Sequence, residues 1–88
     1  MPSVRSAKDR WLRCESRNGM FSGEKAIRLA LPEGQALDAF VPSSEVRVDA
    51  NGAGRVRVQL ISVADHCWVL LPAGSSNPIA VREVDFVG

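Results

Sequence analysis

Short segments of this chain alternate apolar and polar residues. Between residues 27 and 31, isoleucine or leucine occupies every second position, and Arg28 faces the other way. Residues 55–60 repeat the pattern, with arginine or glutamine alternating with valine or leucine. A period of two is typical of strands that bury one face. The pattern therefore predicts a protein built of half-buried β-strands.

Turn-forming residues separate these segments. Residues 32–34 and 51–54 contain glycines, which accept the positive φ that tight turns need. We also expect two short 3₁₀ turns, at residues 42–46 and 82–86. The alternation slips at Leu60-Ile61, where we expect a β-bulge or a sharp bend. The predicted strands are residues 11–16, 25–31, 36–41, 55–63, 67–71 and 79–82.

Length and composition fit one small all-β domain. The chain has 88 residues, of which 45% are hydrophobic and 24% charged, as in soluble globular proteins. We expect a single small antiparallel barrel of five or six strands at residues 11–88, preceded by a flexible N-terminal arm at residues 1–10. An OB-like barrel or a small sandwich is the alternative. The predicted core consists of Leu12, Ile27, Leu29, Leu31, Leu37, Phe40, Val56, Val58, Leu60, Trp68, Leu70, Ile79 and Val81.

The C-terminal half contains four short strand-like segments, at residues 54–58, 68–71, 79–81 and 84–86, with a polar loop before the third. Their order resembles the strand order of SH3-like small barrels. This resemblance implies that a 3₁₀ turn lies beside the last strand. The chain lacks the acidic and aromatic ligand-binding signature of signalling SH3 domains, and it contains no tyrosine. The resemblance therefore does not imply recognition of proline-rich peptides.

A faint echo links the two halves of the chain. Leu31-Pro32-Glu33-Gly34 and Leu71-Pro72-Ala73-Gly74 share the pattern L-P-x-G, and each follows one predicted strand and precedes another. Such a likeness is typical of an internal duplication, but also of unrelated hairpins in a β-protein. The sequence leaves both interpretations open.

Arginines provide one candidate binding surface. Residues 1–31 hold seven basic and three acidic residues, whereas residues 32–88 hold four basic and seven acidic residues. Arginine suits phosphate because its planar fork donates two parallel hydrogen bonds. Trp11 is available to stack on a base, although a solvated arginine-rich face without a ligand is the alternative. The candidate phosphate-binding residues are Arg13, Arg17, Arg28, Arg55 and Arg57.

Met20 and Phe21 are the candidate residues for binding a protein partner. They lie between Gly19 and Gly23, in the loop that joins the first two predicted strands. Exposed apolar residues on such a loop often contact a partner. Alternatively, Phe21 folds back and plugs one end of the barrel.

No catalytic, cofactor or metal site is evident in the sequence. Asp65-His66-Cys67 offers a nucleophile and a base, but neighbouring residues on a strand point to opposite faces. Cys14 and Cys67 lack the C-x-x-C spacing that is typical of structural zinc. We expect two separate buried thiols, with a Cys14–Cys67 disulfide as the alternative.

These observations predict a non-catalytic binding module for a protein partner or for self-association, including a homodimer formed through an open strand edge. The alternative is an RNA- or DNA-binding barrel that uses the N-terminal arginines. A third interpretation is an oligomeric enzyme with its site between subunits. No apolar run is long enough to span a membrane, and no secretory signal is evident. We therefore expect a cytoplasmic protein that needs no cofactor.

Overall fold

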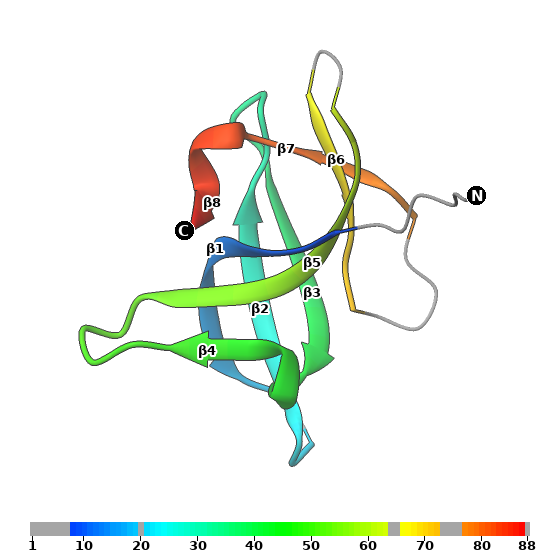
Figure 1. The fold of residues 1–88 in the computed structure, drawn as a ribbon. Coiled ribbons are helices and arrows are strands. Elements are labelled where there is room, and N and C mark those ends of the chain that lie inside the picture. The colour runs from blue at the N-terminus through cyan, green and yellow to red at the C-terminus, as the bar shows by residue number, and fades with distance from the viewer. Residues whose placement is uncertain (1–7, 20, 64–65, 73–76, 88) are drawn as a thin grey trace.

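The computed structural model describes residues 8–19, 21–63, 66–72 and 77–87. The described part consists of strands and two 3₁₀ turns, η1 (Ser43–Glu45) and η2 (Glu83–Asp85), and its sheet curls into an antiparallel half-barrel (Figure 1). The strands are β1 (Lys8–Asn18), β2 (Glu24–Ala30), β3 (Ala36–Pro42), β4 (Val46–Val48), β5 (Gly54–Val63), β6 (Cys67–Leu70), β7 (Ile79–Val81) and β8 (Phe86–Val87). The prediction of an all-β fold is confirmed.

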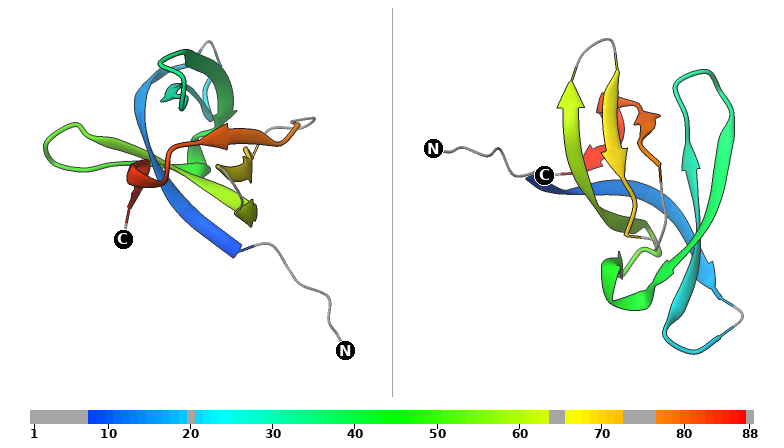
Figure 2. Two further views of the ribbon diagram at one scale, coloured as in Figure 1. Left: turned by 90° about the horizontal axis from the view of Figure 1, so that it is seen from above. Right: turned by 90° about the vertical axis from the view of Figure 1, so that its right-hand side faces the viewer.

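The long strand β1 joins the two parts of the sheet. Its first seven residues pair with β5, and its last four pair with β2. The sheet order is β3-β2-β1-β5-β6-β7, with β4 added beside β5 and β8 added beside β1. Figure 2 shows that β1 curves along its length, and this curvature turns the β2–β3 hairpin toward the β5–β6–β7 part.

Alternation along the strands buries one face of the curled sheet. Eleven apolar residues form the buried core: Leu12, Cys14, Ile27, Leu29, Val41, Val56, Val58, Cys67, Val69, Leu71 and Val81. Burying each large aliphatic side chain contributes about 1.5–3 kcal/mol. The core therefore lies between the β2–β3 hairpin and the β5–β6–β7 part, and the arginines of β1 and β5 are left outside it.

The six predicted strands all occur, within a few residues of their predicted bounds. Both 3₁₀ turns are confirmed, and the pairing of β5 with β6 shifts register between Leu60 and Ser62, as the slipped alternation predicted. The sequence did not predict β4 and β8, because strands of three and two residues are too short to show a period. The sheet therefore has eight strands, not five or six.

Two aromatic residues of the predicted core are exposed instead. Phe40 is 54% exposed, because Val41 takes the inward position of β3. Trp68 is 37% exposed, because Cys67 and Val69 take the inward positions of β6. A shift of one residue in a strand exchanges its two faces. Hydrophobicity alone did not show which face of β3 and β6 is inward.

The boundary of the N-terminal arm also differs from the prediction. Residues 8–10 are not part of an arm, because they belong to β1 and pair with residues 58–60 of β5. Residues 1–7 lie outside the described residues. The sheet thus begins three residues earlier than the predicted domain.

The sheet has an internal twofold arrangement. β1 to β4 form a three-stranded meander, a 3₁₀ turn and a short strand, and β5 to β8 repeat the same order. β4 pairs with β5, β8 pairs with β1, and β1 pairs with β5. The short strand of each half therefore pairs with the first strand of the other half, and every ladder in one half has a counterpart in the other.

The pairing registers define which residues are counterparts. Leu12 pairs with Val56 across β1 and β5, and each also pairs with the first residue of the short strand lent by the other half. Ten of the eleven buried apolar residues form counterpart pairs: Leu12 and Val56, Cys14 and Val58, Ile27 and Val69, Leu29 and Leu71, Val41 and Val81. The repeat suggested by the L-P-x-G echo is thus present in the architecture, but Leu71 corresponds to Leu29 and not to Leu31.

Candidate functional site

Three arginines lie side by side on the outer face of the sheet. Arg13 of β1 is directly opposite Arg55 of β5, and Arg55 is directly opposite Arg47 of β4. Residues in such positions point to the same face, with Cβ atoms about 4.5–5.5 Å apart. We call these three residues the arginine row. None of them forms an ion pair with another described residue, so like charges face one another across three strands.

A second line of side chains runs beside the arginine row. Trp11 is directly opposite Arg57, and the guanidinium carbon of Arg47 lies 5.0 Å from the centroid of a Trp11 ring. Arg57 donates two hydrogen bonds to Glu45, at 3.0 Å and 2.8 Å. These bonds lower the pKa of the Glu45 carboxyl, and the charge of Arg57 adds to the effect. Arg57 is therefore neutralised locally, and Arg47 covers the Trp11 ring that the sequence suggested for base stacking.

Two of the predicted phosphate-binding arginines lie on another part of the sheet. Arg28 of β2 donates hydrogen bonds of 2.7 Å and 3.2 Å to Asp38 of β3. This contact lowers the pKa of the Asp38 carboxyl, to which the charge of Arg17 contributes as well. Arg17 is exposed on β1, in the segment that pairs with β2. The other three predicted arginines share the outer face of β1 and β5.

Sequence reasoning missed Arg47. It lies in the Val46-Arg47-Val48 segment that forms β4, which is too short for a convincing period. The same valine and arginine alternation occurs in residues 55–58, the strand with which β4 pairs. This similarity to β5 was the only sequence feature that pointed to Arg47 as part of the row.

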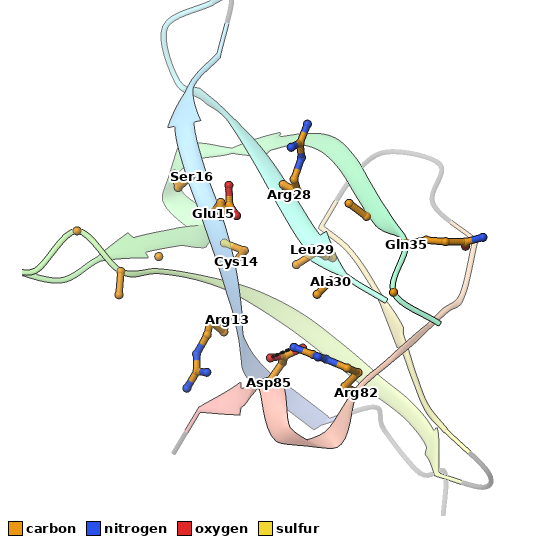
Figure 3. Close-up of a pocket in the computed structure, with 15 residues that line it drawn as sticks. Arg13, Cys14, Glu15, Ser16, Arg28, Leu29, Ala30, Gln35, Arg82 and Asp85 are labelled. Atoms are coloured by element: carbon orange, nitrogen blue, oxygen red, sulfur yellow. Dashed lines mark hydrogen bonds and ion pairs between the residues drawn. The ribbon is translucent and has the colours of Figure 1, made fainter. Parts of the chain in front are cut away.

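Two clefts lie on either side of the β1–β5 junction. The larger, which we call the Arg13 cleft, has a volume of about 570 Å³ (Figure 3). It is lined by Arg13, Cys14, Glu15, Ser16, Arg28, Leu29, Ala30, Gly34, Gln35, Ala36, Gly52, Ala53, Gly54, Arg82 and Asp85. The smaller, which we call the Arg57 cleft, has a volume of about 350 Å³. It is lined by Asp9, Glu45, Arg57, Val58, Gln59, Leu70, Leu71 and Pro72.

The wall of the Arg13 cleft holds one fixed ion pair and one buried hydroxyl. Asp85 is only 5% exposed and accepts two hydrogen bonds from Arg82, at 2.9 Å and 3.0 Å, whereas Arg13 ends apart from both (Figure 3). The Oγ of Ser16 is buried and has no hydrogen-bond partner among the described residues. A Cβ atom at Gly54 would lie 3.1 Å from the Cβ of Ser16, so a side chain there would require its neighbours to move by a few tenths of an ångström.

Of the two residues predicted to contact a protein partner, Met20 and Phe21, the structure describes only Phe21. Phe21 is 71% exposed at the β1–β2 turn, so the alternative that it plugs the barrel is wrong. Met20 lies outside the described residues. The exposed ring of Phe21 remains available to a partner.

The cysteines are separate thiols and not a reactive pair. Cys14 and Cys67 are both free and buried. Burial raises the pKa of the Cys14 thiol to about 11, so this thiol is protonated at neutral pH and is a poor nucleophile. His66 is exposed, and Asp65 lies outside the described residues. Within the described ranges, no group of three or more His, Cys, Asp or Glu side chains could hold a metal ion.

Comparison with known proteins adds no assignment. The chain matches no protein-family model, no curated protein and no solved structure. In the part of the chain that the structure describes, no helix is both long enough and apolar enough to cross a membrane.

Proposed function

We propose that this protein is a non-catalytic binding module for nucleic acid, and that the arginine row contacts the phosphates of the bound strand. The observation that carries the proposal is the register that places Arg13, Arg55 and Arg47 directly opposite one another. Like charges in such positions destabilise the free sheet. A polyanion relieves this repulsion, because arginine donates charge-assisted hydrogen bonds to phosphate oxygens.

The neighbouring ion pairs support the same proposal. Arg28, Arg57 and Arg82 each donate two hydrogen bonds to a carboxylate. The three arginines of the row make no such bonds within the described ranges. Carboxylates thus pair with Arg57 beside the row and with Arg28 and Arg82 elsewhere, and leave the row itself without a carboxylate partner, although the formal net charge is only +1.

Binding of a protein partner or of a second copy is the other candidate function. The exposed rings of Phe21 and Phe40 favour it, because aromatic residues are common binding hot spots. β3 and β7 are the outermost strands of the main sheet order, so either one offers an edge for pairing in a homodimer. We further propose that the half-barrel is SH3-like, and the 3₁₀ turn directly before β8 supports this assignment. The free thiols suit a reducing compartment, and we therefore place the module in the cytoplasm.

The nucleic-acid proposal is tested by fluorescence anisotropy with labelled single-stranded oligonucleotides across a range of salt concentrations. Each phosphate contact contributes about 0.7 to the slope of log affinity against log salt for single strands. Arg55→Ser, at the centre of the row, should weaken binding and reduce that slope by about this amount. Lys25→Ser is the matched control, because it removes one positive charge from β2, outside the row.

Three outcomes would contradict the proposal. The first is that the wild-type protein shows no binding at low salt. The second is that Lys25→Ser reduces the slope of log affinity against log salt as much as Arg55→Ser does. The third is that binding does not depend on salt. The second result would assign the effect to general charge and not to the row. Sedimentation of the wild type and Phe21→Ala tests the second candidate function independently.

A further inference from the structure

The Arg13 cleft and the Arg57 cleft are counterparts in the internal twofold arrangement. Each of the eight residues that line the Arg57 cleft has its counterpart among the residues that line the Arg13 cleft. Arg57 corresponds to Arg13, and Glu45 of η1 corresponds to Asp85 of η2. The chain therefore builds the same kind of cleft twice, and the differences between the two show what is particular to each.

The first difference is whether the central arginine has a carboxylate partner. In the smaller cleft, both oxygens of Glu45 accept hydrogen bonds from Arg57. In the larger cleft, Asp85 is buried and both of its oxygens accept hydrogen bonds from Arg82. Arg13 consequently has no carboxylate partner among the described residues, although its counterpart has one.

The second difference is the polarity of the wall. Ser16 occupies the position that corresponds to Leu60, and Arg28 occupies the position that corresponds to Leu70. Leu60 packs against the core, whereas the buried Ser16 Oγ lacks a hydrogen-bond partner in the described part of the chain. A leucine at residue 16 would avoid the cost of an unsatisfied hydroxyl. The polar wall therefore opposes stability and favours a ligand that hydrogen-bonds there.

We infer that the Arg13 cleft binds a nucleotide unit, with its phosphate at Arg13 and its sugar or base against the polar wall. The inference rests on the proposed function, because Arg13 lies at one end of the arginine row and also lines the cleft. A strand whose phosphates follow the row is thus led to the cleft. The nucleotide is either the terminal unit of that strand or a free mononucleotide.

The cleft has the size and the groups that such a ligand needs. Its volume of about 570 Å³ lies within the range of about 300–1,000 Å³ that is usual for small-ligand sites. Glu15 and Gln35 add an acceptor and an amide to the hydroxyl of Ser16. Two hydrogen bonds to Asp85 fix the orientation of the planar Arg82 guanidinium. Bases stack on such guanidinium planes in nucleic-acid complexes. Arg28 and Arg82 are each paired with a carboxylate, so Arg13 is the arginine of this wall that is left to bind an anion among the described residues.

The experiment is a titration of the isotope-labelled protein with adenosine 5′-monophosphate, followed by two-dimensional NMR. The backbone amide signals of Cys14, Ser16 and Gly54 should shift. Arg13→Ser should weaken this binding by about tenfold or more, because a charge-assisted contact to the phosphate is lost. Arg57→Ser is the matched control, since it removes the counterpart arginine, and it should leave the affinity for the mononucleotide unchanged.

A second variant separates binding from folding. Ser16→Ala should weaken binding of adenosine 5′-monophosphate and also raise the temperature of unfolding, because it removes a buried unsatisfied hydroxyl. A residue with a purely structural role would not show these opposite effects. Equal affinity of wild type and Arg13→Ser for the mononucleotide overturns the inference, and so does equal affinity of the wild type for inorganic phosphate and for the mononucleotide.

The source of the nucleotide is tested with short oligouridylates that carry a 5′-phosphate or a 5′-hydroxyl group. Preference for the 5′-phosphate, lost in Arg13→Ser, assigns the cleft to the end of a strand. Mononucleotide binding without any oligonucleotide binding assigns it to a free mononucleotide and rejects the function proposed for the row. Salt-dependent oligonucleotide binding through Arg55, without mononucleotide binding and without a 5′-phosphate preference, overturns the inference and leaves the function proposed for the row intact.

Discussion

At the scale of single residues, carboxylate pairing divides the arginines into two groups. Arg28, Arg57 and Arg82 are held by carboxylates, and these contacts raise the pKa of each guanidinium. The Arg28–Asp38 and Arg57–Glu45 pairs are exposed, and ion pairs of this kind contribute little to stability. The main effect of the three contacts is local, because they cancel charge at three points. Five described arginines have no carboxylate partner, and three of them, Arg13, Arg47 and Arg55, lie side by side in the row.

The exposure of Phe21 leads to a prediction about stability. Phe21→Ala should change the free energy of unfolding by no more than about 0.5 kcal/mol, because its ring is 71% exposed. Leu29→Ala, which truncates a buried side chain, should cost about 2–5 kcal/mol. Denaturant unfolding measures both. A loss of about 3 kcal/mol for Phe21→Ala would mean that the ring is docked in solution.

The two cysteines lead to a prediction about reactivity. Cys14 and Cys67 should both be counted as free thiols in the denatured, non-reduced protein. In the native protein Cys14 should react slowly with iodoacetamide at pH 8, because its pKa of about 11 leaves little thiolate. Its reaction rate should rise as the pH increases toward that pKa. Recovery of no free thiol after denaturation would instead establish the disulfide alternative.

At the scale of elements, alternation predicted the strands better than their faces. The period of two located six strands and the bulge near Leu60, since these depend on local pattern. Phe40 of β3 and Trp68 of β6 were assigned to the wrong face, although Leu37 of β3 packs against the core as predicted. Both faces of each strand carry apolar residues, and only tertiary packing selects one. Arg13 and Arg55 were predicted as phosphate-binding residues, but the row itself depends on register across β1, β5 and β4. Register and the contribution of Arg47 are long-range properties that a period cannot reveal.

Close packing at the junction of β1 and β5 leads to a prediction for Gly54. A Cβ atom there would lie 3.0 Å from the carbonyl oxygen of Cys14 and 3.1 Å from the Cβ of Ser16. Gly54→Ala should therefore destabilise the protein by about 1–3 kcal/mol, as overpacking of a core does. Ala53→Ser changes an exposed neighbour and should stay within about 0.5 kcal/mol. Thermal unfolding of both variants checks the difference, and equal stability of the two would refute the close approach.

At the scale of the whole molecule, the twofold arrangement makes each half depend on the other. β4 completes the second half and β8 completes the first, while Leu12 and Val56 meet between them in the buried core. Neither half holds its own short strand, so we expect the chain to unfold as one cooperative unit. The same arrangement also repeats the cleft, once beside Arg13 and once beside Arg57. Glu45 pairs with Arg57, whereas its counterpart Asp85 pairs with Arg82, and this difference leaves Arg13 without a carboxylate partner among the described residues.

Removing the carboxylate of Glu45 should therefore extend the surface of unpaired arginines. Glu45→Gln should release Arg57, which lies on the same strand and the same face as Arg55, and so add a fourth cation beside the arginine row. The affinity for single-stranded nucleic acid should rise at low salt, and the slope of log affinity against log salt should steepen by about 0.7. Glu33→Gln makes the same change in net charge at an exposed position in the β2–β3 turn, where it releases no arginine. Anisotropy titrations should show a steeper slope for Glu45→Gln than for Glu33→Gln. Equal slopes would mean that net charge governs binding, and that the position of the free arginines on β1, β4 and β5 does not.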